Sequence, residues 1–195
     1  MTELWVFGYG SLIWRPDFPY IERSAARLIG AHRALCVYSW VHRGTRSHPG
    51  LVLGLDRGGA CRGVGFRVAP EAWEEVLAYL REREQVTAVY IEQMREARLA
   101  DGRLRQMLTF VVDRSHAQYA GKLDEETQFS LVTSATGRSG ANRDYVINTA
   151  AHLKELGMPD ARLERLASRL KALDTATTLT RRGGGDAALR AADRR

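Results

Sequence analysis

A short apolar segment near the N-terminus ends in a glycine-bracketed polar turn, and this junction constrains the fold more than any other feature. Residues 4–9 are rich in aromatic and branched side chains, which is typical of a buried strand. The strand runs into Gly8-Tyr9-Gly10-Ser11, where two glycines allow a sharp turn and a close approach of the backbone to a ligand. Successive N–H groups in such a turn can converge on an anion or a developing oxyanion. We therefore expect a ligand site where the first strand ends.

The composition is typical of a soluble globular protein. The chain has 195 residues, 45% hydrophobic and 27% charged, which is enough to bury a core without disulfides or metals. No apolar run reaches membrane-spanning length, and the N-terminus lacks a signal-peptide pattern, so we expect a cytoplasmic protein with no membrane partner. Cys36 and Cys61 lie in apolar, strand-like contexts, which favours buried thiols over a disulfide.

The net charge of +6 raises the question of a nucleic-acid partner. Five arginines cluster in the Gly/Ala-rich segment after residue 180, and elsewhere Arg alternates with Glu, as in Arg81-Glu82-Arg83-Glu84, which is typical of a solvated mixed surface. We therefore expect no nucleic-acid partner and an acidic small-molecule substrate. One domain over 1–176 and a disordered basic tail over 177–195 are predicted. The sequence does not indicate the oligomeric state.

Strand signals dominate the first part of the chain and helix signals the last part. Several strands around one helix predict an α+β fold, with a mixed sheet or small β-barrel and packed helices, better than a doubly wound α/β fold. The expected strands cover 4–9, 27–38, a hairpin of 51–56 and 60–68 turning at Arg57-Gly58-Gly59, and a hairpin of 87–99 and 104–112 turning at Asp101-Gly102. A helical turn is expected after Pro19, a polar loop over 41–50, and helices from Pro70, over 142–156 and over 160–173.

The helix that begins at Pro70 carries a carboxylate on its apolar face. Trp73, Val76, Leu77 and Leu80 have the spacing of a core stripe, and Glu84 falls about 20° from Leu77 if the helix continues. Three interpretations stay open: the helix ends near residue 83 and Glu84 is solvated, Glu84 is buried and paired with an arginine, or it is a general base in a partly dry cavity with a raised pKa. Glu82 falls on the opposite face.

A second polar, glycine-punctuated segment, over 134–145, leads into a helix. Asn142 is a suitable N-cap, and Tyr145 falls in the first helical turn. A helix N-terminus with hydroxyls beside it can hold a substrate carboxylate, although composition alone favours an ordinary capped helix after a flexible loop.

Several common sites are not supported. His42 and His48 with the cysteines lack metal-ligand spacing, so no metal is expected. Ile13 stands where a dinucleotide-binding loop needs its third glycine, a Walker loop is absent, and no base is indicated for Ser11 as a nucleophile.

Taken together, these segments resemble the ChaC-type gamma-glutamylcyclotransferases over about residues 4–173. The departures are Asp144, where the family more often has Glu, and the Arg-rich tail. The segments that carry the resemblance are Phe7-Gly8-Tyr9-Gly10-Ser11-Leu12-Ile13-Trp14-Arg15-Pro16, His42-Arg43-Gly44, Pro49-Gly50, Cys61-Arg62-Gly63-Val64-Gly65, Arg83-Glu84, Tyr90, and Ser139-Gly140-Ala141-Asn142-Arg143-Asp144-Tyr145.

The resemblance implies a compact mixed α/β barrel and cofactor-free cleavage of glutathione to 5-oxoproline and cysteinylglycine. Glu84 would be the catalytic acid/base, and the substrate-binding residues would be Phe7, Gly8, Tyr9, Gly10, Ser11, Leu12, Tyr90 and Tyr145. Three alternatives stay open: a cyclotransferase for other gamma-glutamyl amides or peptides, an inactive gamma-glutamyl-binding protein, and a basic RNA-associated protein.

Overall fold

The computed structural model describes residues 3–84 and 87–173. The chain divides into two compact units between Asn142 and Arg143. The first unit holds the strands and the helices that precede this boundary, and the second holds most of one helix and a further helical segment over 161–173. The single domain expected over 1–176 remains a prediction, and the tail expected over 177–195 lies outside the described residues.

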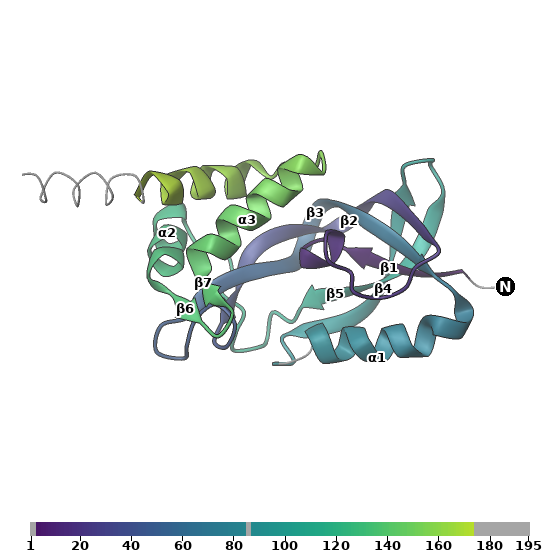
Figure 1. The fold of residues 1–195 in the computed structure, drawn as a ribbon, viewed down its shortest axis with the longest axis horizontal. Coiled ribbons are helices and arrows are strands. Elements are labelled where there is room, and N and C mark those ends of the chain that lie inside the picture. Colours follow the sequence, from purple (N-terminus) through teal and green to yellow (C-terminus); the bar gives the residue numbers. More distant parts are fainter. Residues whose placement is uncertain (1–2, 85–86, 174–195) are drawn as a thin grey trace, which may run out of the picture. The chain divides into compact units, whose positions relative to one another are not determined.

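Five strands of the first unit close into a barrel with the order β1-β3-β2-β4-β5 (Figure 1). β1 pairs with β3 in antiparallel fashion and meets β5 in parallel fashion at Val6 and Leu108, which closes the barrel. Trp5 and Phe7 of β1 are fully buried, as expected for an apolar strand inside a core. The predicted mixed barrel with packed helices is confirmed. The strands are β1 (Leu4–Gly8), β2 (Glu22–Ser39), β3 (Gly50–Val68), β4 (Tyr90–Leu99) and β5 (Leu104–Val112).

The hairpin predicted around Arg57-Gly58-Gly59 is wrong, because β3 runs through this segment without turning. β2 and β3 pair on both sides of it, with Ile29 opposite Ala60 and Ala31 opposite Arg57. Gly58 and Gly59 have φ values of +92° and +71°, and Gly30 on β2 has +88°. A left-handed Gly-Gly pair suits a two-residue turn, but here it forms an irregularity of the β-bulge type between two long paired strands.

Two other boundaries differ from the sequence-based expectation. The helical turn predicted after Pro19 is wrong: the 3₁₀ turn η1 (Ser11–Ile13) lies earlier, and β2 already begins at Glu22. β4 begins at Tyr90 and not at Thr87, because Ala88 has a φ of +56° that extended backbone does not allow. The predicted turn at Asp101-Gly102 is confirmed, with Gly102 at φ +90°.

The helices of the first unit begin after a proline or a capping carboxylate and carry acidic residues in their first turns. Pro70 opens the 3₁₀ turn η2 (Pro70–Ala72), which leads into α1 (Trp73–Glu84). Arg81 of α1 pairs with Glu92 of β4, and Figure 1 shows α1 beside this part of the barrel. The helix α2 (Glu125–Ser134) was not predicted from the sequence, although Asp124 caps it by accepting a hydrogen bond from the N–H of Thr127 at 2.8 Å.

The small hairpin β6 (Thr136–Gly137) and β7 (Gly140–Ala141) leads into α3 (Asn142–Glu155). The predicted capping role of Asn142 is wrong, because its side-chain oxygen accepts a hydrogen bond from the Leu51 N–H at 2.7 Å, and its amide nitrogen donates to Leu51 O at 2.7 Å. The fully buried amide thus serves as a strand-like partner for β3.

In the second unit, α3 ends at a left-handed glycine as predicted. Gly157 has a φ of +67°; its N–H donates to Lys154 O, and the N–H of Met158 donates to Leu153 O. These two bonds form a Schellman motif, and Met158 and Leu153, at the two positions that usually form its apolar contact, are both buried.

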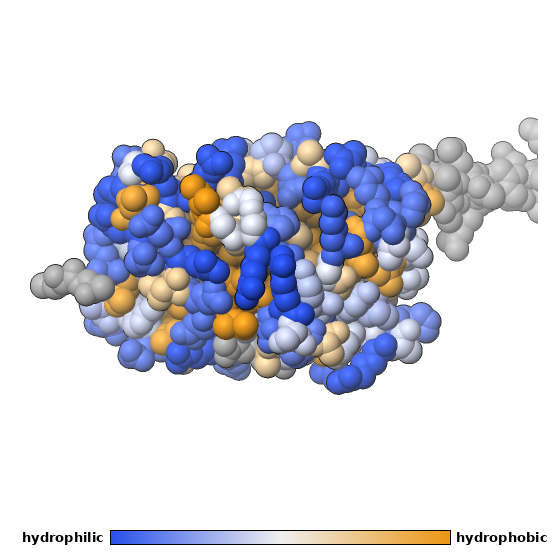
Figure 2. Space-filling model, turned by 180° about the vertical axis from the view of Figure 1, so that it is seen from behind, coloured by the Kyte–Doolittle hydropathy of each residue, from blue (hydrophilic) through white to orange (hydrophobic). Residues whose placement is uncertain are grey.

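Hydrophilic side chains cover most of the face seen in Figure 2, with hydrophobic ones in patches between them. Ile29 and Met94 are among the exposed large hydrophobic side chains. Cys36 and Cys61 are buried free thiols, as predicted, and burial raises the pKa of Cys36 to about 12. Within residues 3–84 and 87–173, no helix is both long and apolar enough to cross a membrane.

Candidate functional site

The turn after β1 presents backbone donors beside an open surface. Its first internal hydrogen bond runs from the Ile13 N–H to Gly10 O at 2.9 Å, so the N–H groups of Ser11 and Leu12 have no partner within the turn. A Cβ added to Gly10 would meet only Leu53 Cδ1, at 3.9 Å. The backbone is therefore accessible at Gly10, as the sequence analysis expected of a ligand-binding turn.

The neighbouring strands β2 and β3 contact the backbone of the turn and fix its position. Arg33 of β2 donates from Nε to Tyr9 O at 2.5 Å and from Nη2 to Arg62 O at 2.7 Å. On β3, a Cβ added to Gly63 would lie 2.3 Å from Gly8 O, so only glycine permits this approach of the two backbones. Neither the role of Arg33 nor that of Gly63 was predicted from the sequence. Gly63 belongs to a segment of the family resemblance, whereas nothing in the local sequence distinguishes Arg33.

Glu84 is the last residue of α1, which confirms that the helix extends this far. Its side chain is only 18% exposed, whereas Glu82 is exposed, as the helical phase predicted. Burial raises the pKa of the Glu84 carboxyl above its usual range, and the positive charge of Arg83 opposes this shift. A raised pKa moves a carboxyl toward the range that suits general acid/base chemistry. The catalytic role of Glu84 stays a prediction.

Arg83 links the end of α1 to the turn after β1. Its Nη2 donates to Ser11 Oγ at 3.0 Å, and its Nε lies 3.5 Å from Glu84 Oε1. The turn that offers the N–H groups and the helix end that carries Glu84 are therefore joined through one side chain.

The remaining predicted binding residues differ in what surrounds them. Phe7, Tyr9 and Leu12 are buried, which suits a role in shaping the turn. Tyr90 donates from its hydroxyl to Leu53 O at 2.8 Å, and the Leu53 side chain borders Gly10. Tyr145 lies in the first turn of α3, in the second unit, so its relation to the barrel stays a prediction.

Two segments of the family resemblance that lie far apart in the sequence pair closely. The N–H groups of Arg138 and Ser139 donate to Val41 O and His42 O, both at 2.9 Å. A Cβ added to Gly137 would lie 2.6 Å from the N of Gly44, so the β6–β7 hairpin and the 40–49 loop meet backbone to backbone. The polar loop predicted over 41–50 is thus built into the fold.

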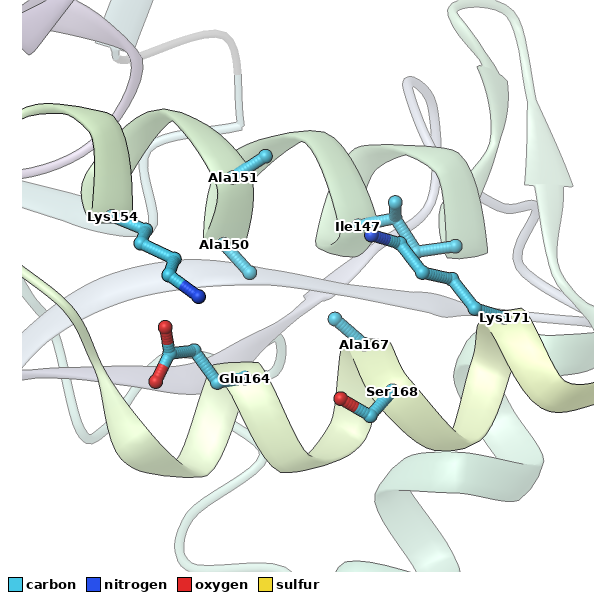
Figure 3. A pocket seen from close by; sticks show the side chains of 8 residues that line it. All are labelled: Ile147, Ala150, Ala151, Lys154, Glu164, Ala167, Ser168 and Lys171. Carbon is cyan, nitrogen blue, oxygen red and sulfur yellow. The ribbon is translucent and has the colours of Figure 1, made fainter.

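A hollow of about 310 Å³ lies within the second unit, between α3 and the helical segment over 161–173 (Figure 3). Lys154 and Glu164 point toward each other across it, and small apolar side chains form much of its wall. None of the predicted site residues lines it. The lining residues are Ile147, Ala150, Ala151, Lys154, Glu164, Ala167, Ser168 and Lys171.

In the described parts of the chain, no group of three or more His, Cys, Asp or Glu side chains is arranged to hold a metal ion.

Comparison with known proteins identifies the family. Residues 4–173 match the family described as ChaC-like protein. The chain belongs to the ChaC-like family. This ChaC-like chain is 35% identical over 170 residues to the glutathione-specific gamma-glutamylcyclotransferase of Escherichia coli K12, covering 87% of this chain and 74% of that protein. It is 33% identical over 178 residues to glutathione-specific gamma-glutamylcyclotransferase 1 of Homo sapiens, covering 88% and 79%.

A solved structure supports the fold of this ChaC-like protein. A yeast gamma-glutamyl cyclotransferase specific to glutathione superimposes with a TM-score of 0.78 at 21% identity, covering 88% of this chain and 97% of that one. The predicted gamma-glutamylcyclotransferase-like barrel is thereby confirmed as the fold.

Proposed function

We propose that this ChaC-like protein cleaves glutathione into 5-oxoproline and cysteinylglycine. Membership of the family and relatives named as glutathione-specific gamma-glutamylcyclotransferases support the substrate and the reaction. The observation that supports the chemistry is the half-buried Glu84. Burial raises the pKa of its carboxyl, and Arg83 joins it to the turn after β1.

The reaction needs one group that moves a proton and one surface that holds the substrate folded back on itself. Glu84 accepts a proton from the α-amine of the gamma-glutamyl group, and the amine attacks its own γ-carbonyl, forming the C–N bond of a five-membered ring. The amide C–N bond then breaks, and Glu84 returns the proton to the departing amine. No water is consumed, so the chemistry is of the lyase type and needs no cofactor or co-reactant.

The fold contributes positioning and electrostatic stabilisation. Because the attack is intramolecular, restricting the glutamyl chain to its reactive conformation supplies much of the rate. The N–H groups of Ser11 and Leu12 bind the glutamyl head group or the oxyanion that develops on the γ-carbonyl. Phe7, Gly8, Tyr9 and Gly10 shape this turn, and we assign Tyr90 to the binding of the same head group, while the binding role of Tyr145 stays a prediction.

We also propose a cytoplasmic location. Buried free thiols at Cys36 and Cys61 suit a reducing compartment, where the proposed substrate is abundant in its thiol form.

A product assay tests this function. The purified protein is incubated with glutathione, and separately with gamma-glutamyl-alanine, and 5-oxoproline and the released amine are measured by mass spectrometry. We expect 5-oxoproline and cysteinylglycine in equal amounts from glutathione. Turnover of gamma-glutamyl-alanine alone would overturn the glutathione assignment and retain the reaction, whereas no product from either at high enzyme concentration would indicate a binding protein.

A further inference from the structure

Arg83 contacts its own helix and three residues of the segment over 11–17. From α1, its Nη1 donates to the hydroxyl of Tyr79 at 2.5 Å and to Arg15 O at 2.9 Å, while Nη2 reaches Ser11 Oγ. Nη1 also lies 3.6 Å from a carboxylate oxygen of Asp17. A planar guanidinium with five N–H donors is suited to contacts of this kind, in which one rigid group bonds partners in several directions.

The segment after the turn needs such an anchor. Asp17 has a φ of +56°, a left-handed conformation that is uncommon for residues other than glycine and persists where surrounding contacts hold it. The carboxylate of Asp17 bonds Arg15 Nε at 3.1 Å as well as facing Arg83. The backbone over 11–17 is therefore held to α1 by Arg83 at its first residue, at Arg15 and at Asp17.

We propose that Arg83 is a positioning residue that fixes the turn carrying Ser11 relative to the Glu84 carboxylate and favours the ionised form of that carboxylate. This inference rests on the proposed function, because it assumes that Glu84 is the base and that the turn binds the substrate. Arg83 itself touches no reacting atom in this proposal: it acts through Ser11, the 11–17 backbone and Glu84.

The charges around Glu84 support the second part of the proposal. Burial disfavours ionisation of Glu84, and the neighbouring Arg83 cation opposes this effect. Two further charged groups lie near Arg83: Asp17, 3.6 Å from its Nη1, and Arg15, which is paired with Asp17. Removing the positive charge of Arg83 therefore removes the effect that opposes burial, so the pKa of the Glu84 carboxyl rises further.

The test compares the pH dependence of kcat/KM for glutathione in the wild type, Arg83→Gln, Arg83→Lys and Arg81→Gln. Arg81 is the matched control: it lies two residues earlier on α1, is exposed, and pairs with Glu92 at 2.8 Å. We expect Arg83→Gln to lower kcat/KM by about 100-fold through misplacement of the turn. We also expect the acidic limb of the pH profile, where kcat/KM falls as Glu84 becomes protonated, to move to higher pH. The substrate titrates identically in every variant, so a displaced limb reports a group of the enzyme.

Arg83→Lys separates the two roles. Lysine retains the positive charge but lacks the planar set of N–H donors of the guanidinium. The acidic limb should therefore stay at the wild-type pH while kcat/KM falls. Arg81→Gln should match the wild type in both respects.

An acidic limb of Arg83→Gln that coincides with that of the wild type would overturn the proposal, as would an equal displacement in Arg81→Gln. If Arg83→Gln does not fold, the Arg83→Lys variant tests the proposal by itself. A kcat/KM of Arg83→Lys within about twofold of the wild type would contradict a positioning role. The Glu84→Gln variant distinguishes failure of the proposed function from failure of this inference. If Glu84→Gln is active, Glu84 is not the base. If Glu84→Gln is inactive and the acidic limb of the Arg83→Gln profile is not displaced, only the inference about Arg83 is overturned.

Discussion

At the scale of the single residue, Glu84 combines burial with a carboxyl that the proposed chemistry needs in its ionised form. Its side chain is 18% exposed, and burial raises its pKa, opposed by the charge of Arg83. Burying a carboxylate without full compensation costs free energy, and such costs are typical of functional groups in enzyme sites. Under the proposed function, the protein places Glu84 where its ionised form costs stability.

This cost predicts a pH-dependent difference in stability between the wild type and Glu84→Gln. A raised pKa means that the destabilisation is absent below the unfolded-state pKa of about 4.3 and grows as the pH rises through the folded-state pKa. We expect Glu84→Gln to be at least as stable as the wild type at pH 8, with the difference vanishing toward pH 4. Urea unfolding across this range measures it; a wild type that is the more stable protein at pH 8 would contradict the argument.

The sequence predicted which glutamate of α1 is buried better than the contacts that hold the turn after β1. Helical phase alone distinguished the half-buried Glu84 from the exposed Glu82. Arg33, which bonds Tyr9 O from β2, could not be found in this way, because its partner lies 24 positions away and only the barrel brings them together.

At the scale of the elements, a hydrogen-bonded cluster around Asp56 ties the segment after β5 to β3. Asp56 accepts from Arg114 Nε at 2.7 Å, from the Tyr119 hydroxyl at 3.0 Å and from the Arg57 N–H at 2.8 Å. Burial opposes ionisation of Asp56, but these hydrogen bonds outweigh it and hold its pKa below the usual range. Tyr119 also forms a β-bridge with Val37, so the cluster fixes this segment on the barrel.

We expect Asp56→Asn to lower the free energy of unfolding by about 2 kcal/mol at pH 7, a moderate value because the Arg114 partner is 43% exposed. Tyr119→Phe should cost about 1 kcal/mol. Because a lowered pKa stabilises above the unfolded-state value of about 3.9 and this contribution is lost as the pH falls through the folded-state pKa, the Asn variant should approach the wild type below pH 4. Denaturant titrations at pH 7 and pH 3.5 measure both effects, and a difference that persists unchanged in acid would argue against the cluster.

At the scale of the whole molecule, the barrel was predictable as a class and its topology was not. Alternating and apolar segments predicted the strands, but Gly58 and Gly59 fit a tight turn and a bulge equally well by local chemistry. Only the long pairing of β3 with β2 distinguishes the two. The Asn142 amide shows the same limit, since a residue suited to capping its own helix bonds β3 instead.

The family match ends at residue 173, and we propose that the residues after 176 take no part in the reaction. We expect a chain truncated after residue 176 to retain the kcat/KM and melting temperature of the full chain. A parallel assay of both proteins with glutathione checks this; loss of activity on truncation would assign the last 19 residues to the functional protein.

The central claim is that Glu84 moves the proton, and steady-state kinetics of Glu84→Gln with glutathione test it most directly. General acid/base catalysis by one positioned group contributes about 10²–10⁴-fold, so kcat should fall by at least about 100-fold while the circular dichroism spectrum stays that of the wild type. Glu82→Gln, which removes the same group from the exposed face of the same helix, should stay within about twofold of wild-type activity. Near-normal turnover by a correctly folded Glu84→Gln enzyme would contradict the assignment.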